Sequence, residues 1–393
     1  MSYLKFHSDR LFDGYRFRNQ NEVLIATPKG VIEGIVPLED AGDDVQHIDG
    51  IICPGFINAH CHLELSYLKN SIQQHTGLLS FISQVMQGRN AATELIEEAI
   101  IQAENEMIAN GIVAVGDICN TTHTIVQKQK GRLQYQNLIE VAGFIPDAAK
   151  NRFNSISEVA KEFYQLFPNN TSIVPHAPYS VSAPLFDLIK NNSNNKVFSI
   201  HNQESAQENL FFKEKQGDFL NLYKNIGVDL SFFNSIGKGS IDYYLHNVAS
   251  DINSIFVHNT FTSKDDIDNI IQHLKNPYFC LCPQANLYIE NQLPDINLFR
   301  QVNGGNNIVI GTDSLASNSS LNILKELSVI ENHYPEVSIE ELLKWATING
   351  AKAISFEKSL GSFEKYKTPG IIKIISEKYS LINLDISTIE VFL

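Results

Sequence analysis

Two histidines one residue apart close an apolar run in the first sixth of the chain, within the string PGFINAHCHLELS. Side chains at positions i and i+2 of a strand project to the same face, so His60 and His62 can direct both imidazoles at one metal ion. Surface histidines also occur at this spacing by chance. The pair alone therefore leaves both interpretations open.

Three further β-rich runs end in residues of the same chemical kind, at His201, His258 and Asp313. If these runs are parallel strands of a barrel, their carboxyl ends meet on one rim, which is where the active sites of such barrels lie. Five imidazole or carboxylate groups from four strands would then converge. This convergence favours a metal site over scattered core or surface residues.

The elements that must position these groups alternate from about residue 50 onward. Short runs rich in Val, Ile and Phe, typical of strands buried on both faces, are separated by helical patterns. One helix is expected over 91–110, where apolar residues recur at helical spacing before Gly111, and another over 263–275, after an S-x-x-D start at Ser263. The expected strands are 51–60, 112–118, 134–142, 171–177, 196–201, 253–258, 278–282 and 307–313.

Strands that alternate with helices in this way predict an α/β protein built on a closed (β/α)8 TIM barrel. An open doubly wound sheet is the alternative, but it usually carries a Gly-rich phosphate turn, and the sequence has no G-x-G-x-x-G. The chain ends, 1–50 and 357–393, contain short β-like runs without helical periodicity. Neither can bury a core alone. We therefore expect both ends to pair as one small β domain beside a barrel domain of residues 51–356.

Composition limits the class of partner. The 393 residues include 30 Lys and Arg against 44 Asp and Glu, a formal net charge of −14. This balance argues against nucleic acid, which needs clustered Lys and Arg, and no run approaches the ~18 apolar residues of a membrane span. The five cysteines are odd in number and widely spread, which fits a reducing compartment. We expect a cytoplasmic protein that acts on a small molecule and that has neither nucleic acid nor a membrane as its partner. The assembly that we consider for it is a homodimer.

The motifs resemble those of the amidohydrolase superfamily, in its cytosine-deaminase and chlorohydrolase-like branch. The matching strings follow the family's order: PGFINAHCH at 54–62, HAPYS at 176–180, HNQE at 201–204, VHN at 257–259 and GTDS at 311–314. The resemblance implies a hydrolase that acts on carbon–nitrogen bonds other than peptide bonds. It also implies roles for six residues, namely metal ligation by His60, His62, His201 and Asp313 and proton handling by Glu204 and His258.

The chemistry of these residue types agrees with that assignment. Three neutral imidazoles and one carboxylate suit Zn²⁺, with Fe²⁺ as the alternative, provided that one coordination position stays open. Asp313 and His258 can accept or orient a water proton, and Glu204 can carry a proton to a ring nitrogen and then to the leaving group. A solvated surface glutamate is the alternative for Glu204.

Three other residues are candidates near the same strand ends. Family members with two metal ions bridge them with a carboxylated lysine near the end of the fourth strand. In this chain the fourth expected strand and the residues after it, 171–182, contain no lysine, and His176 stands at the strand end. We therefore expect one metal. His176 is expected to bind substrate, with a hydrogen bond to the backbone as the alternative. Glu64 and Glu140 are candidates for substrate contact. For each of them, the role of an ordinary structural carboxylate is the alternative.

Deamination of an aromatic amine is the leading reaction, because the H-x-x-E pattern formed by His201 and Glu204 suits proton delivery to a ring nitrogen. The string HCHLELS at 60–66 most resembles aminofutalosine deaminases. These act on an adenine nucleoside and are related to adenosine, methylthioadenosine and adenosylhomocysteine deaminases. The resemblance thus implies ammonia release from an adenine nucleoside or a related purine or pyrimidine. Opening of a cyclic amide, as in imidazolonepropionase-like relatives, is the alternative, and a non-catalytic metal-binding scaffold is the least favoured.

Overall fold

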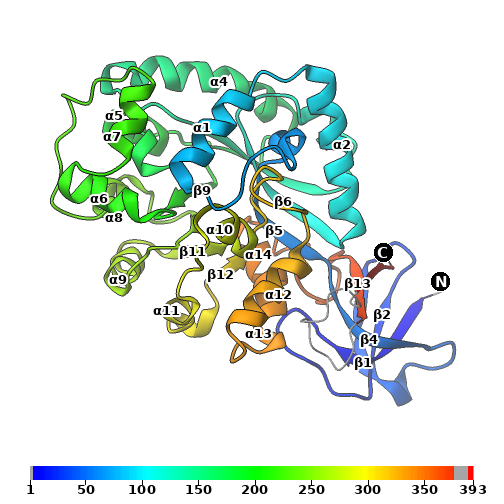
Figure 1. Cartoon of the computed structure of the whole chain (residues 1–393). Coiled ribbons are helices and arrows are strands. Elements are labelled where there is room, and N and C mark those ends of the chain that lie inside the picture. Colours follow the sequence, from blue (N-terminus) through cyan, green and yellow to red (C-terminus); the bar gives the residue numbers. More distant parts are fainter. Residues whose placement is uncertain (1–2, 376–387, 393) are drawn as a thin grey trace.

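Two parallel sheets form the centre of the larger part of the molecule (Figure 1). The computed structural model describes residues 3–375 and 388–392, and within this part the two four-stranded sheets have the orders β5-β6-β7-β8 and β12-β11-β10-β9. Each strand pairs in parallel with its neighbours. The strands are β5 (Phe56–Cys61), β6 (Ile112–Cys119), β7 (Gln134–Val141), β8 (Thr171–Pro175), β9 (Val197–Asn202), β10 (Asn253–His258), β11 (Asn276–Leu281) and β12 (Ile308–Ile310).

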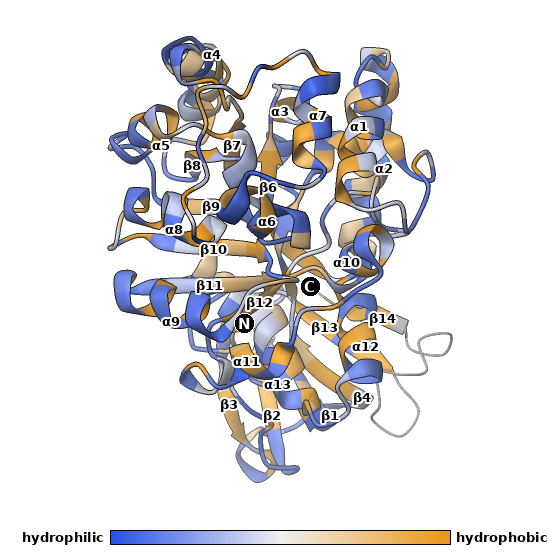
Figure 2. Ribbon diagram, turned by 60° about the vertical axis from the view of Figure 1, so that its left-hand side comes forward, coloured by the Kyte–Doolittle hydropathy of each residue, from blue (hydrophilic) through white to orange (hydrophobic). Residues whose placement is uncertain are grey.

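Helices follow the strands and cover them, with hydrophobic residues concentrated along the strands and hydrophilic ones on outer helices such as α9 (Figure 2). The helix expected over 91–110 is α2, and the one expected over 263–275 is α9, which begins with a capping box between Ser263 and Asp266. Both predictions are confirmed. The helices are α1 (Leu78–Gly88), α2 (Thr93–Ala109), α3 (Ile125–Lys128), α4 (Ala149–Leu166), α5 (Ala183–Lys190), α6 (Ala206–Glu214), α7 (Phe219–Asn225), α8 (Ser240–Tyr244), α9 (Lys264–His273), α10 (Pro283–Glu290), α11 (Ile296–Arg300), α12 (Ile323–His333), α13 (Ile339–Lys344) and α14 (Gly350–Ala353).

The strand expected over 51–60 is in fact two strands in different sheets. β4 (Gln46–Pro54) belongs to a third sheet, and β5 starts after Gly55. A Cβ atom on Gly55 would lie 2.3 Å from Val113 Cγ1 and 2.9 Å from the carbonyl oxygen of Pro369, so only glycine fits where the chain changes sheets. The residues on both sides are fully buried. No polar residue therefore marks the break in the sequence.

The third sheet, in the described residues, has six strands in the order β14-β13-β4-β1-β2-β3 and joins segments from both chain ends. β4 lies between β1, with which it is parallel, and β13, with which it is antiparallel. Residues 1–2, 376–387 and 393 of the expected end domain lie outside the described residues, and its status as a separate domain stays a prediction. The remaining strands are β1 (Leu4–Leu11), β2 (Glu22–Ala26), β3 (Ile32–Pro37), β13 (Ile371–Ile375) and β14 (Thr388–Val391).

All five cysteines are buried and free. Among the helices of the described residues, none combines the length and the apolar character that a membrane crossing requires.

A truncated chain of residues 51–356 should lose stability, because it lacks the first half of β4 and both of that strand's partners, β1 and β13. Phe12, Ile372 and Ile374, which the truncation removes, are fully buried in the main hydrophobic core. Deleting a buried Phe or Ile side chain typically costs ~2–5 kcal/mol. We expect the truncated chain to be insoluble or to unfold at a clearly lower temperature, as measured by circular dichroism. Full stability and activity of this fragment would show that the end sheet is dispensable.

Candidate metal centre

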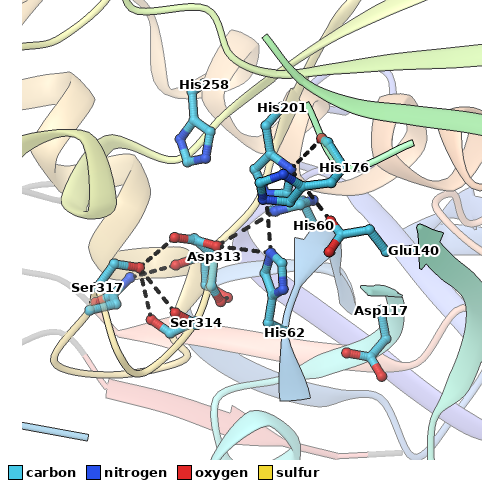
Figure 3. Close-up of polar contacts among 12 residues, drawn as sticks. His60, His62, Asp117, Glu140, His176, His201, His258, Asp313, Ser314 and Ser317 are labelled. Carbon is cyan, nitrogen blue, oxygen red and sulfur yellow. Dashed lines mark hydrogen bonds and ion pairs between the residues drawn. The ribbon is translucent and has the colours of Figure 1, made fainter. Parts of the chain in front are cut away.

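Four of the residues singled out from the sequence meet in one buried place (Figure 3). The ligand atoms of His60, His62, His201 and Asp313 all lie within 4.8 Å of one another. Nε2 of His62 is 3.2 Å from Nε2 of His201 and 3.4 Å from Oδ1 of Asp313. Nε2 of His60 is 3.6 Å from the same Oδ1 atom. The ends of β5, β9 and β12 thus bring three imidazoles and one carboxylate together.

The hydrogen bonds of these groups leave electron pairs facing the centre. Nδ1 of His201 lies 2.8 Å from the carbonyl oxygen of His176, which can only accept, so Nε2 of a neutral His201 carries its lone pair. Both ring nitrogens of His60 are buried and have no hydrogen-bond partner within the described residues. Such atoms cost free energy unless something satisfies them. A divalent cation at the centre would satisfy the nitrogen that carries the lone pair, and the residues therefore fit a metal ion.

Electrostatics favour the protonation states that bind metals. Burial lowers the pKa of His60 to about 4 and that of His62 to about 3, so both rings are neutral at pH 7. Burial works against ionisation of Asp313, but contact with His60 and the neighbouring imidazoles hold the pKa of its carboxyl well below its usual range. Neutral imidazoles and an ionised carboxylate are the forms that ligate a metal.

The backbone at the site is held in an uncommon conformation. His258 and Asp313 have φ values of 72° and 54°, in the left-handed region that costs a non-glycine residue on the order of 1–3 kcal/mol. The amide of Asp313 donates to the carbonyl oxygen of His60 at 3.1 Å, and the hydroxyl of Ser317 donates to Oδ2 of Asp313. These bonds hold the carboxylate so that its Oδ1 atom faces the imidazoles.

Glu204 and His258 lie beside this cluster. Nδ1 of His258 is 2.8 Å from Oδ1 of Asn286, whose amide nitrogen donates to Thr260. Nδ1 therefore carries the proton, and Nε2 presents a lone pair 3.7 Å from Oε1 of Glu204. Burial raises the pKa of Glu204 to about 8. A carboxyl group with such a pKa can hold or release a proton near neutral pH, as general acid–base catalysis requires.

His176 and Glu140 adjoin His201 on its other side. Oε1 of Glu140 is 3.6 Å from Nδ1 of His201, and Nδ1 of His176 is 2.7 Å from Oγ of Ser180. Burial opposes ionisation of Glu140, but the imidazoles of His176 and His201 lower the pKa of its carboxyl to about 2. Both residues line a cavity of about 430 Å³. The structure thus places both where a substrate can reach them.

Glu64 lies elsewhere. Its carboxylate accepts hydrogen bonds from the amides of Asn120 and Thr121, at 3.0 and 3.1 Å, and from the Thr121 hydroxyl at 2.9 Å. It is not among the residues that line the cavity. Its position is that of a structural carboxylate that fixes the turn after β6.

The cavity adjoins the cluster of potential metal ligands and has mostly apolar walls. Its floor includes His62, His201, Glu204, His258 and Asp313. The walls come from α1, from the segment between β7 and α4 with the start of α4, and from α7 and the chain that follows it. They include Leu78, Phe81, Ile82, Val85, Phe144, Leu222, Tyr223 and Ile226, together with the cations of Arg89 and Arg152.

Sequence reasoning missed a buried ion pair beside the strand that carries His60. Nζ of Lys128 is 2.6 Å from Oδ2 of Asp117, and both side chains are fully buried. Oδ1 of Asp117 accepts the backbone amide of Leu63 at 2.8 Å, which fixes the chain next to His62. A signal was present, because Asp117 is a carboxylate near the end of an otherwise apolar strand. No comparable signal marked Arg89, which follows α1, or Arg152, which lies in the first turn of α4.

Comparisons with known proteins agree with this geometry. The chain is 28% identical over 316 residues to an adenosine deaminase of Helicobacter pylori, covering 78% of this chain and 75% of the relative. Its fold matches the crystal structure of H. pylori aminofutalosine deaminase in complex with methylthio-coformycin, with a TM-score of 0.84, 23% identity and coverage of 99% and 98%. It also matches an adenosine deaminase from Xanthomonas campestris with bound zinc, with a TM-score of 0.74, 19% identity and coverage of 98% and 89%.

The decisive match is to the sequence model of the amidohydrolase family, which covers residues 51–381. This range includes all the motifs at the strand ends. The chain therefore belongs to the amidohydrolase family and is a hydrolase of carbon–nitrogen bonds, as its motifs predicted.

Proposed function

We propose that the protein is a metal-dependent deaminase that hydrolyses the amino group of an adenine nucleoside or a related purine and releases ammonia. The observation that carries the proposal is the position of Glu204, a buried carboxyl group with a raised pKa, beside the His/Asp cluster on the cavity floor. The names of the relatives support it, because they include adenosine and aminofutalosine deaminases.

We infer that one zinc ion is held by His60, His62, His201 and Asp313. When bound, such an ion acts as a Lewis acid and lowers the pKa of water. Three imidazole nitrogens and one carboxylate oxygen match the ligands that zinc takes in catalytic sites. The X. campestris neighbour with bound zinc supports the choice of metal.

The residues around the cluster divide the proton transfers. Hydrolysis replaces the exocyclic amine by an oxygen from water, so the ring nitrogen and the departing amine must each receive a proton. Glu204 can carry both because its carboxyl group lines the cavity and burial raises its pKa to about 8, close to neutral pH. His258 accepts or orients a proton through the lone pair on Nε2, which the Asn286 contact leaves free. Asp313 acts in the same way through Oδ1.

The cavity favours a substrate larger than a free base. Its volume of about 430 Å³ lies in the range of small-molecule sites. The apolar walls from α1 and α7 suit a nucleoside with an apolar substituent, and Arg89 and Arg152 add positive charge for an anionic group. An aminofutalosine-like nucleoside combines these properties.

We also infer that the two parallel sheets close into a single (β/α)8 barrel. Between β8 and β9, the amide of His201 donates to the carbonyl oxygen of His176 at 2.9 Å. Between β12 and β5, the amides of Thr312 and Asp313 donate to the carbonyl oxygen of His60 at 3.0 and 3.1 Å. Closure at both seams would explain why the strand ends share one rim.

An ammonia-release screen with metal-replete enzyme tests the reaction. We expect ammonia from at least one adenine nucleoside among adenosine, methylthioadenosine, adenosylhomocysteine and aminodeoxyfutalosine, with guanine and cytosine as comparison substrates. Ring opening of a cyclic amide without ammonia release from any amine would instead favour the imidazolonepropionase-like alternative.

Metal analysis tests the stoichiometry of the buried site. We expect one tightly held divalent ion per chain after gentle purification without chelators, because the cluster offers four ligand atoms around one centre. Two tightly held ions, or none, would contradict the assignment.

A further inference from the structure

Glu140 lies near the end of β7 and lines the cavity that adjoins the metal centre. Its side chain is almost fully buried, with 4% of the residue exposed. Within the described residues, its Oε1 atom has no hydrogen-bond partner. A buried carboxylate oxygen without a donor costs free energy. A molecule bound in the cavity can supply the missing donor.

The neighbouring histidine does not satisfy this oxygen. Nδ1 of His201 lies 3.6 Å from Oε1 of Glu140 but 2.8 Å from the carbonyl oxygen of His176. The longer separation is outside the range of a hydrogen bond, so the Nδ1 proton belongs to the carbonyl. Oε1 therefore needs a donor that does not come from His201.

Asn120, which directly follows β6, holds the carboxylate in place. Its Nδ2 atom donates to Oε2 and to the backbone carbonyl oxygen of Glu140, each at 3.1 Å. Its Oδ1 atom accepts the guanidinium of Arg89 at 3.3 Å, and its backbone amide donates to Glu64 at 3.0 Å. Because a guanidinium only donates, this contact fixes the orientation of the amide. The carboxylate is thus positioned before a ligand binds, as selective recognition requires.

The place of Glu140 in the site indicates which part of a substrate it meets. Figure 3 shows Glu140 and His258 on opposite sides of His201, and Oε1 of Glu204 lies 3.7 Å from Nε2 of His258. In the proposed reaction Glu204 serves the ring nitrogen and the amine, so Glu140 faces another part of the molecule. The base of an adenine nucleoside has no N–H group other than its amine. The sugar hydroxyls are therefore the donors that remain for Oε1.

We propose that Glu140 is a specificity-determining residue that accepts a hydrogen bond from a hydroxyl of the sugar ring, with Asn120 as its positioning residue. This inference rests on the proposed deamination of an adenine nucleoside and narrows the substrate to one that carries the ring hydroxyls. A site built to bond to a hydroxyl rejects an analogue without it, because the buried polar group is then left unpaired. Free bases, and nucleosides without these hydroxyls, should be poor substrates.

Deamination kinetics of the metal-replete full chain test the inference. Adenosine, or whichever adenine nucleoside releases ammonia fastest, is compared with its dideoxy analogue, which lacks both hydroxyls of the sugar ring. We expect the wild-type enzyme to favour the hydroxylated substrate by ~10–100-fold in kcat/KM, as a hydrogen bond to a charged group allows.

Two substitutions of Glu140 separate the acceptor from the shape of the side chain. Glu140→Met keeps the length but removes the acceptor, and the hydroxyl preference should disappear. Asn120 stays satisfied in this variant, because its Nδ2 atom also donates to the backbone carbonyl oxygen of residue 140. Glu140→Gln, whose amide can still bond to a hydroxyl, should keep part of the preference, and it tests the inference even if the Met variant does not fold.

Two controls distinguish this role from a structural one. The metal content of Glu140→Met should equal that of the wild-type enzyme, because His201 keeps its bond to the backbone of His176. Glu104→Gln alters another buried carboxylate, which accepts the hydroxyl of Tyr135 near the start of β7, and should leave the hydroxyl preference unchanged.

The outcomes separate this inference from the proposed function. Ammonia release without a hydroxyl preference in the wild-type enzyme would overturn the inference and leave the deaminase assignment intact. Equal losses on both substrates in Glu140→Met, or loss of its metal, would also overturn it, because Glu140 would then act through His201 and not on the sugar. No ammonia from any adenine nucleoside would contradict the proposed function and the inference with it.

Discussion

Glu204→Gln should lower kcat by at least ~10² while the metal content of the enzyme stays unchanged. The amide keeps the shape of the side chain but cannot carry a proton, and general acid–base help is typically worth ~10²–10⁴ in rate. Because the cluster of potential ligands does not include Glu204, its replacement should not release the ion. Steady-state kinetics on the substrate found by ammonia release, together with metal analysis, measure both effects.

Glu64→Gln is the matched control for this experiment. Glu64 is also a buried glutamate, and burial raises the pKa of its carboxyl to about 7. It faces the Asn120–Thr121 turn instead of the cavity. We expect kcat to change much less in this variant. Near-full activity of Glu204→Gln would sink the proposed chemistry, although the metal site could survive that result.

His201→Ala should strip the metal and abolish activity with it. The substitution removes one of the four ligands, so that the remaining ligands, which include the imidazoles of His60 and His62, no longer complete the coordination shell of the metal. Metal analysis after dialysis should give far less than one equivalent. Ligand loss should also lower the unfolding temperature, because a metal that binds only the native state stabilises it.

His176→Ala provides the comparison for the loss of His201. Its ring contacts Ser180, and the carbonyl oxygen that receives Nδ1 of His201 belongs to the backbone, which the substitution retains. We expect this variant to keep its metal and to change KM. A full equivalent of metal in His201→Ala would show that the buried cluster is not the metal site.

The convergence of the cluster could be predicted because it depends on a simple regularity. Parallel strands end on the same side, so His60, His201 and Asp313 at three strand ends had to lie near one another. The start of α9 was equally predictable, since Ser263 and Asp266 satisfy each other's backbone amides locally. Both features follow from residues close together in sequence or from strand direction alone.

The remaining features depend on contacts between distant segments. At the switch between sheets, Gly55 is closely approached by Val113 and Pro369, which lie far from it in the sequence. The apolar walls of the cavity come from α1 and α7, which pack over the strand ends from different parts of the chain. Glu64 follows His62 by two residues, yet the end of β6 draws its carboxylate away from the cavity.

The position of β4 has a consequence for synthesis on the ribosome. β4 ends at Pro54, but β13, which covers its second edge, begins only at Ile371. At ~5–20 residues per second, the wait for that partner lasts on the order of tens of seconds. During this time the apolar run through Ile51 and Ile52, fully buried in the finished protein, has an open hydrogen-bonding edge. Such an edge is a template for pairing with another chain. Nascent chains released before β13 emerges should therefore aggregate through β4.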